Sequence, residues 1–342
     1  MNNHIDWTKL GFNYRDVNSH IRYVWRDGEW DGGELCADPH FNINIAATAL
    51  HYGQTAFEGL KAFRCADGKV RLFRPNMNAR RLQNSAKRIR MPRLSEPMFL
   101  AAVRRVIEDN MEYVPPYGSG GSLYVRPLLF GNGPQIGIHP AQEYVFIILV
   151  LPVGPYYQEG LKPVRAVILD EYDRAAPQGV GHVKVGGNYA ASLVPHMVAM
   201  EKGFQVELYL DAKEHKYVEE FGTSNFIGIK GDDTFVTPES ASILPSVMND
   251  SLQKVAKDEG LKVERRPVPY DELKEFSEIG ACGTAVVITP ISEIVRGDEA
   301  IKVSQAETCG PVLQKLYNRV TAIQYGEEED EFGWAFELAD CG

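Results

Sequence analysis

Short apolar runs alternate with amphipathic stretches along the chain, a pattern typical of strands and helices in turn. The longest continuous apolar run is Val145–Leu151. It is much shorter than the roughly 20 residues of a membrane span, and it predicts a buried strand over Tyr144–Leu151. Met98–Asn110 places apolar residues at helical spacing on one face, and Ser95 precedes it as an N-cap. The pattern predicts a globular protein that mixes strands and helices.

The same pattern predicts further strands at Ile21–Trp25, Ser122–Phe130, Val164–Leu169, Gln205–Leu210, Asn225–Ile229 and Gly280–Ile288. It predicts further helices over Asn188–Lys202, from about Ser246, and over Val312–Ile323, the last ending at Gly326. Residues 154–163 contain two glycines and two prolines, so we interpret them as a linker. With 342 residues in all, we expect an α+β fold of two domains, residues 1–153 and 164–342, joined by residues 154–163.

Composition excludes several classes of partner. The net charge of −10 argues against nucleic acid and anionic membranes. The N-terminus lacks the basic and apolar regions of a secretory signal. The five cysteines are odd in number and form no Cys-x-x-Cys pair, and the eight histidines are scattered. A disulfide framework or a metal site is therefore not expected, and a cytoplasmic location fits best.

No P-loop, zinc-protease or nucleophile-elbow motif occurs in the sequence. The most informative segment is residues 179–192 (GVGHVKVGGNYAAS). The glycines of residues 131–137 have the wrong spacing for a dinucleotide loop. In the segment, Lys184 stands among apolar residues and glycines just before an expected helix. It is either a surface lysine beside a glycine turn or a lysine that forms an imine. An imine-forming lysine needs a partly desolvated amine, and glycines that let a flat cofactor approach.

Residues 184–189 (KVGGNY) resemble the cofactor-lysine motif of branched-chain amino acid aminotransferases of fold type IV. Further segments match that family in the same order: HYGQTAFEGLKAF (51–63), LFRPNMNARRLQNSA (72–86), LYVRPLL (123–129), EEFGTSNF (219–226), ACGTAVVITPI (281–291) and IQYG (323–326). They cover nearly the whole chain, and coincidence across so many spaced segments is not credible. The resemblance implies the two-domain α+β fold of fold type IV, similar to D-amino acid aminotransferase, with pyridoxal 5'-phosphate as cofactor.

The resemblance also implies which residues bind the cofactor. Lys184 would hold it as an imine, and Glu220 would keep its ring nitrogen protonated, because a carboxylate favours a neighbouring positive charge. The adjacent Glu219 is expected to be exposed. The remaining implied contacts are Arg81 to the phosphate, Tyr189 to the phenolic oxygen, the backbone amides of Val247 and Met248 at a helix N-terminus, and the Thr284 hydroxyl.

For the substrate, the resemblance implies that Tyr124 and Arg126 orient the carboxylate from one face of a strand. The other implied substrate contacts are Tyr52 and Phe57 around the side chain, the Thr223 hydroxyl, and the backbone amides of Thr284 and Ala285. Plain core packing is nearly as good an interpretation of Tyr52 and Phe57. Ser246 and Asn249 depart from the family pattern, in which many members have glycine and arginine. The amides do the binding there, so the phosphate site is expected to survive with its fine geometry open.

The implied reaction moves the amino group of L-leucine, L-isoleucine or L-valine to 2-oxoglutarate, giving the branched 2-oxo acid and L-glutamate. The freed Lys184 amine would act as general base and then acid. The expected partners are small amino acids and 2-oxo acids, and a second copy in a homodimer. Alternatives are a D-amino acid aminotransferase, an aminodeoxychorismate lyase, or a non-catalytic metabolite-binding relative. The Tyr-Val-Arg-Pro strand and Gly-Thr-Ala turn favour the branched-chain type, and retention of Lys184 and Glu220 argues against a non-catalytic one.

Overall fold

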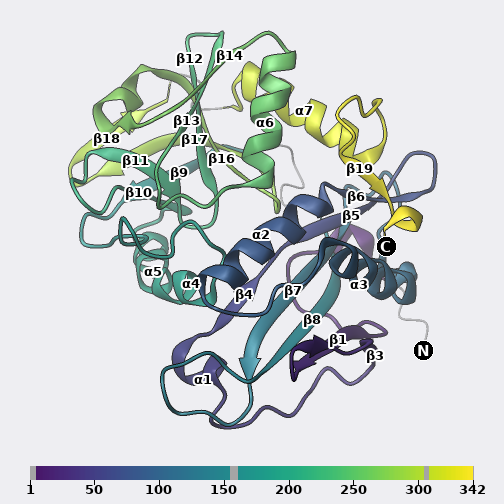
Figure 1. Ribbon diagram of the computed structural model, residues 1–342. Coiled ribbons are helices and arrows are strands. Elements are labelled where there is room, and N and C mark those ends of the chain that lie inside the picture. Colours follow the sequence, from purple (N-terminus) through teal and green to yellow (C-terminus); the bar gives the residue numbers. More distant parts are fainter. Residues whose placement is uncertain (1–4, 155–160, 304–307, 342) are drawn as a thin grey trace. The chain divides into compact units, whose positions relative to one another are not determined.

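The computed structural model describes residues 5–154, 161–303 and 308–341 (Figure 1). The chain divides into two compact units. Unit 1 comprises residues 1–156, 184–187 and 322–342, and unit 2 comprises residues 157–183 and 188–321. Unit 1 thus takes in the short segment around Lys184 and the end of the chain. Of the expected linker, residues 155–160 lie outside the described residues.

Unit 1 is built on a sheet whose described strands pair in the order β19-β6-β5-β7-β8-β1-β2, with β3 added to β1 and β4 to β7. The strands are β1 (His20–Arg26), β2 (Glu29–Trp30), β3 (Glu34–Cys36), β4 (Thr55–Phe57), β5 (Leu60–Arg64), β6 (Val70–Phe73), β7 (Ser122–Asn132), β8 (Glu143–Val153) and β19 (Ala335–Glu337). The antiparallel pair of β7 and β8 forms the centre, because both strands are apolar and mostly buried. The strands predicted within β1, β7 and β8 are confirmed.

Helices α1 (Thr48–Tyr52), α2 (Pro75–Arg88) and α3 (Glu96–Asp109) belong to unit 1. The Ser95 side chain accepts a hydrogen bond from the Met98 amide, which confirms the predicted N-cap of α3. The apolar face of α3 packs against β1 and β8 (Figure 1). Helix α2 begins with Pro75 and packs against α3 and β4. These contacts fix α2, and Arg81 with it, beside β4.

Unit 2 contains a ring of strand pairings. Its strands are β9 (Val164–Ile168), β10 (Val206–Leu210), β11 (Tyr217–Phe221), β12 (Asn225–Lys230), β13 (Thr234–Pro238), β14 (Lys262–Arg266), β15 (Val268–Pro269), β16 (Phe276–Gly283), β17 (Val287–Arg296) and β18 (Glu299–Lys302). The order β12-β16-β17-β9-β10-β11 closes on itself, because β11 also pairs with β12. A closed ring has no open edge along these strands and encloses a core.

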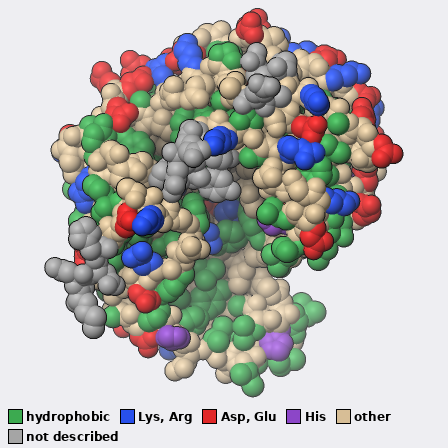
Figure 2. Space-filling model, turned by 180° about the vertical axis from the view of Figure 1, so that it is seen from behind, with side chains coloured by type: hydrophobic (Ala, Val, Ile, Leu, Met, Phe, Trp, Pro, Cys, Tyr) green, Lys and Arg blue, Asp and Glu red, His purple; other side chains and the backbone are tan. Residues whose placement is uncertain are grey.

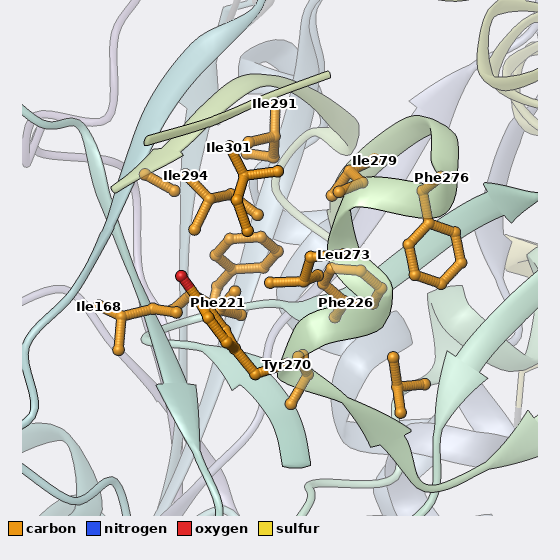
Figure 3. Close-up of a cluster of buried hydrophobic side chains, with 14 of the residues drawn as sticks. Ile168, Phe221, Phe226, Tyr270, Leu273, Phe276, Ile279, Ile291, Ile294 and Ile301 are labelled. Atoms are coloured by element: carbon orange, nitrogen blue, oxygen red, sulfur yellow. The ribbon is translucent and has the colours of Figure 1, made fainter. Parts of the chain in front are cut away.

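Apolar side chains from every strand of the ring make up that core. Figure 3 shows part of it, including Ile168 from β9, Phe221 from β11, Phe226 from β12 and Ile294 from β17. The Phe221 and Phe226 rings stack with their centroids 6.1 Å apart. The short 3-10 helix at Tyr270–Glu275 adds Tyr270 and Leu273 to the same cluster. This packing makes the ring a rigid support for the loops at its end.

The helices after residue 160 are α4 (Gly186–Ala191), α5 (Leu193–Glu201), α6 (Val247–Asp258) and α7 (Pro311–Tyr325). The single helix predicted over Asn188–Lys202 is therefore wrong: it breaks at Ser192. Pro195 explains the break, because its ring has no N–H for the Ala191 carbonyl and clashes with it. Within the described ranges, no helix is both long and apolar enough to cross a bilayer.

The apolar strand predicted over Gly280–Ile288 is also wrong, since it is two strands. Strand β16 ends at Gly283, residues 284–286 form a turn, and β17 returns antiparallel from Val287. Apolar residues continue through the turn, so the pattern alone gives no break. Val287 has a φ of 68°, a left-handed conformation that costs a β-branched residue energy. The turn carrying Thr284 and Ala285 is therefore held in a strained shape by the strands on either side.

Candidate active site

The backbone of Lys184 is fastened within unit 1 on both sides. Its N–H donates to the Ser85 Oγ at 3.0 Å, and its carbonyl accepts from the Phe57 N–H at 3.1 Å. Val185 continues the contact as an isolated bridge to Ala56. The Lys184 Nζ lies 4.6 Å from the centroid of the Phe57 ring. The side chain of Lys184 is thus placed over an aromatic face by a fixed backbone, unlike that of an ordinary surface lysine.

The two glycines after Val185 have different surroundings. A Cβ on Gly186 would overlap the Thr55 hydroxyl, so this glycine permits the close approach of the lysine segment to β4. A Cβ on Gly187 would meet nothing within 4 Å. The glycines of this segment were expected to let a flat cofactor approach. Gly186 instead allows the lysine segment to pack against β4 of unit 1.

Arg81 lies on α2 with its guanidinium directed at Glu58. The Nε donates to Oε1 of Glu58 at 2.7 Å and the Nη2 to Oε2 at 2.8 Å. Glu58 is completely buried, and the Arg81 side chain is 12% exposed. Arg81 is therefore held by a forked ion pair in a largely desolvated place, a suitable arrangement for an arginine that recognises a phosphate.

Phe57, Tyr124 and Arg126 gather on one face of the sheet of unit 1, which the alternation along β7 predicts for the last two. The Arg126 Cζ lies 5.0 Å from the Phe57 centroid and 5.2 Å from that of Tyr124. Its Nη2 donates to the Tyr124 hydroxyl at 3.0 Å. The Arg126 Nε is buried without a hydrogen-bond partner among the residues that the structure describes. A buried donor in this condition is suited to an incoming anion.

Two further features shape this face. A Cβ on Gly59 would overlap the Tyr124 hydroxyl, so only glycine leaves room for it. Lys61 pairs with Tyr124 across β5 and β7 and shares its face. Burial lowers the pKa of Lys61 to about 8. Near neutral pH this amine adds positive charge to the face that carries Arg126.

Tyr52 does not join this group through its hydroxyl. It ends α1, is 44% exposed, and donates to the carbonyl of Ile136. Leu50 on the same helix, and Ile136 and Ile138 on the loop after β7, are exposed as well. Tyr52 therefore belongs to an exposed apolar surface of unit 1.

In unit 2, the carboxylate of Glu220 is buried and held on both oxygens. Its Oε1 accepts from the Leu244 amide at 2.8 Å and lies 2.9 Å from the Arg174 Nη1. Its Oε2 accepts from the Asn225 side chain at 3.1 Å. Arg174 also donates to the carbonyls of Gly181 and Ser242. The carboxylate that the resemblance assigns to the cofactor is thus held in a fixed orientation.

The expectation that Glu219 is exposed is wrong. Glu219 is 3% exposed, accepts from the Ser240 hydroxyl at 2.6 Å, and also contacts the Ser242 hydroxyl. Neighbouring side chains on a strand point to opposite faces, and both faces of β11 are covered here. The two adjacent carboxylates therefore have separate sets of partners.

Thr223, Thr284, Ala285 and the start of α6 lie near the end of the ring that carries Glu220. Thr223 lies in the turn that joins β11 to β12, and Glu220 pairs with Asn225 on either side of it. A Cβ on Gly283 would lie 4.0 Å from the Thr223 carbonyl oxygen. The turn of Thr284 and Ala285, which follows Gly283, therefore lies close to Thr223. Leu244, whose amide binds Glu220, lies just before α6.

Helix α6 begins at Val247, as the sequence predicts for the phosphate site. Ser246 is its N-cap and accepts from the Asn249 amide at 3.1 Å. The Asn249 side chain donates to Thr237 at 2.8 Å. The two departures from the family pattern therefore cap the helix and tie it to β13, while Val247 and Met248 supply its first amides.

Tyr189 lies on α4, where the backbone is set by Asn188. The Asn188 side chain donates to the carbonyls of Val180 at 2.8 Å and Val183 at 3.1 Å. It thereby fixes the loop that leads to Lys184. The Tyr189 carbonyl accepts from the Ser192 hydroxyl at 2.8 Å, at the point where α4 ends.

Comparison with known proteins agrees with these features. A family model for amino-transferase class IV matches residues 55–294, well over half of the chain. The chain belongs to the class IV aminotransferases. All candidate residues except Tyr52 fall inside the matched span. A branched-chain-amino-acid aminotransferase of Haemophilus influenzae is 46% identical over 342 residues, covering 98% of this chain and 99% of that protein.

Solved structures of similar aminotransferases support the same conclusion. The branched-chain amino acid aminotransferase of Escherichia coli has a TM-score of 0.77 at 29% identity, covering 92% of this chain and 99% of its own. The branched-chain aminotransferase of the archaeon Thermoproteus uzoniensis, solved with norvaline, has a TM-score of 0.77 at 25% identity, covering 93% and 99%. The expected α+β fold of fold type IV is confirmed, and so is the resemblance to branched-chain aminotransferases.

Sequence reasoning on this class IV aminotransferase missed the residues that hold the candidates in place. They are Glu58, Asn78 and Ser85 in unit 1, and Arg174 and Asn188 in unit 2. Glu58 lies inside a segment that matched the family, next to Phe57, and a charged residue between apolar neighbours was the available signal. Arg174 had no local signal, because Glu220 and Ser242, two of its partners, are far away in the sequence.

Proposed function

We propose that this class IV aminotransferase transfers the amino group of L-leucine, L-isoleucine or L-valine to 2-oxoglutarate, using pyridoxal 5'-phosphate. The observation that carries the proposal is the Lys184 amine, fixed over Phe57 by backbone bonds to Ser85 and Phe57. Full-length identity of 46% to a branched-chain enzyme supports the choice of substrate. The products are the branched 2-oxo acid and L-glutamate.

The donors and acceptors described above suit pyridoxal 5'-phosphate. When bound, the cofactor supplies an electron sink that stabilises negative charge at the substrate Cα. Glu220, paired with Arg174, would keep the ring nitrogen protonated, and Tyr189 would bond the phenolic oxygen. The other residues that would hold it are Lys184 at the aldehyde, and Arg81, Thr284 and the first amides of α6 at Val247 and Met248 on the phosphate. The chemistry of these groups supports the fit: one amine, one carboxylate, and several hydrogen-bond donors that can bind an anion.

Lys184 would also move the proton. The Lys184 amine would take the proton from the substrate Cα as general base and return one as general acid. A fixed backbone with a flexible side chain suits this task, because the amine must reach different atoms from one anchor. The Phe57 ring, whose centroid lies 4.6 Å from the Nζ, offers this amine an aromatic face.

An aromatic surface and a cationic group would together recognise the substrate side chain. Phe57 and Tyr124 offer aromatic surface to a branched side chain, where each buried methylene contributes roughly 0.8 kcal/mol. Glutamate must use the same pocket, and Arg126 carries a buried Nε for its second carboxylate. The Thr223 hydroxyl and the amides of Thr284 and Ala285 would bind the carboxylate next to Cα.

We also propose a homodimer. Unit 1 exposes Ile45, Leu50, Tyr52, Ile136 and Ile138, the last at 89%, and apolar patches of this kind mark contact surfaces. It also has a cavity of about 370 Å³ walled by Phe41, Leu128, Ile147 and Leu149. The space-filling view shows hydrophobic side chains gathered over unit 1 (Figure 2). A second copy would cover this surface, and Ile138→Glu should then give a monomer by sedimentation, whereas Ile138→Val should not.

Steady-state rates for a panel of L- and D-amino acids with 2-oxoglutarate test the function. Leucine, isoleucine and valine should be the best donors, and aspartate and lysine poor ones, because a charged side chain loses several kcal/mol of hydration on an apolar wall. A specificity constant about tenfold higher for D-alanine or an aromatic amino acid than for leucine would overturn the branched-chain assignment. Detection of no transamination with any donor would overturn the whole proposal.

A further inference from the structure

We infer that Glu58 is a positioning residue for phosphate recognition, because it fixes the orientation of the Arg81 guanidinium. This orientation (the aim of Arg81) affects cofactor affinity more than the negative charge of Glu58 does. The inference rests on the proposed function. Glu58 is completely buried and lies beside Phe57, between β4 and β5. The sequence patterns assign no function to Glu58.

The carboxylate of Glu58 is fully engaged. Its two oxygens bind Nε and Nη2 of Arg81, and its Oε2 also accepts from the Asn78 side chain at 2.8 Å. Gly59 adds a longer backbone bond of 3.3 Å. Asn78 is itself 2% exposed, so the pair has little access to water. The guanidinium plane can therefore rotate only by breaking several buried bonds.

Stability alone gives no reason to keep such a pair. Burying two charges has a large desolvation cost, and apolar residues of similar volume often serve as well or better. What a forked pair does supply is geometry: it holds Nε and Nη2 and so fixes the plane of the guanidinium and the direction of its opposite edge. A carboxylate beside a phosphate site would otherwise be a disadvantage, because like charges repel.

The same elements also fix Lys184. On α2, Asn78, Arg81 and Ser85 are three and four residues apart and so share one face. The Ser85 hydroxyl donates to the Arg81 carbonyl at 3.0 Å and accepts from the Lys184 N–H at 3.0 Å.

A second route joins the two residues through β4. The Lys184 carbonyl accepts from Phe57, the residue next to Glu58. Lys184 and Arg81 are thus joined by two short routes, one through Ser85 and one through Phe57 and Glu58. The cofactor's aldehyde and phosphate are joined by a rigid ring, so the amine and guanidinium that meet them must keep a fixed separation.

Charge and aim predict opposite results for Glu58→Gln. This variant removes a negative charge near the phosphate, so charge alone predicts tighter binding of pyridoxal 5'-phosphate. Loss of aim predicts weaker binding. We expect the dissociation constant of the cofactor from the apo-protein, measured by equilibrium dialysis, to rise by about tenfold or more. The dissociation constant of pyridoxal, which lacks the phosphate, should stay within about twofold. Tighter or unchanged binding of the phosphorylated form would overturn the inference.

Three further variants separate aim from general damage. In an Arg81→Ala background, Glu58→Gln should no longer weaken cofactor binding, since the weakening passes through Arg81. Asn78→Ala loosens Glu58 while leaving the ion pair, and it should shift the same ratio in the same direction, which keeps the test usable if Glu58→Gln fails to fold. Glu278→Gln, at another buried carboxylate with backbone donors, should change thermal stability and leave the ratio alone. Equal losses for pyridoxal and its phosphate in Glu58→Gln would show a merely structural role. Failure of the unaltered chain to bind the cofactor would instead overturn the proposed function.

Discussion

The Arg174 guanidinium lies 2.9 Å from the Glu220 carboxylate, with side chains that are 6% and 4% exposed. Arg174 also binds the carbonyls of Gly181 and Ser242. It therefore ties the carboxylate to the loop before Lys184 and to the loop before α6. Together with the Asn225 side chain and the Leu244 amide, Arg174 holds the Glu220 carboxylate in one orientation. This ion pair and the Glu58–Arg81 pair share one design, in which a candidate cofactor contact is aimed by a buried partner of opposite charge.

The first prediction concerns Glu220. Glu220→Gln should retain cofactor but lower kcat by about two orders of magnitude, because a neutral amide cannot hold the ring nitrogen protonated. Glu219→Gln is the matched control, since Glu219 is the adjacent buried glutamate with partners of its own. It should keep kcat within about threefold. Steady-state rates and bound cofactor per chain are measured for both, and near-normal turnover in Glu220→Gln would assign the role to another group.

The second prediction concerns Lys184. Lys184→Ala should abolish transamination and should leave no cofactor attached to the protein after borohydride reduction. The exposed Lys202 provides a control, and Lys202→Ala should behave like the unaltered chain. Mass spectrometry of the reduced proteins locates the attached cofactor. Attachment to Lys61, which pairs with Tyr124 across β5 and β7, would move the assignment there.

A third prediction follows from Glu278. Its carboxylate accepts from the Val312 and Leu313 amides, which begin α7, and burial raises its pKa above 4.5. When the folded-state pKa of an acid is raised, the unfolded state ionises first as pH increases. Stability is then greatest below the unfolded pKa and falls as pH rises through the folded pKa. The free energy of unfolding of the unaltered chain should therefore fall over this window relative to Glu278→Gln, as measured by urea titrations at several pH values. A constant difference across the window would contradict the shift.

Local signals were enough for much of the fold. The α3 cap at Ser95 and the start of α6 near Ser246 were predictable, because a helix start depends mainly on residues within one turn. The buried strand over Tyr144–Leu151 was also predictable from its apolar run. One error had a local cause, since Pro195 breaks the helix predicted over Asn188–Lys202. Another arose where a distant contact decides. Glu219 is buried because β11 lies in a closed ring, and ring closure has no local signature.

The candidate site shows the same division. Motif matching named Lys184, Arg81 and Glu220 as candidates, and the structure gives each of them a fixed environment. Motif matching could not find the residues that orient these three side chains. Arg174 reaches Ser242 across many residues of sequence, and Glu58 meets Arg81 only once α2 packs beside β4. Such pairs depend on tertiary packing, so they become visible only with coordinates.

The last prediction tests how substrate is read, through Gly59. A Cβ at this position would overlap the Tyr124 hydroxyl, which accepts from Arg126. Gly59→Ala should therefore displace Tyr124 and release Arg126 from its present position over the Phe57 ring. If Arg126 binds the second carboxylate of glutamate, kcat/KM for glutamate should fall by about tenfold or more, and that for leucine by much less, since leucine relies on aromatic surface.

Gly32→Ala is the control for Gly59→Ala, because a Cβ there meets nothing within 4 Å. It should leave both specificity constants unchanged. Equal losses for glutamate and leucine in Gly59→Ala would mean that Tyr124 maintains the shape of the pocket and that Arg126 does not distinguish the two side chains. A loss confined to leucine would reverse the assignment, because the aromatic wall would then be the part that moved.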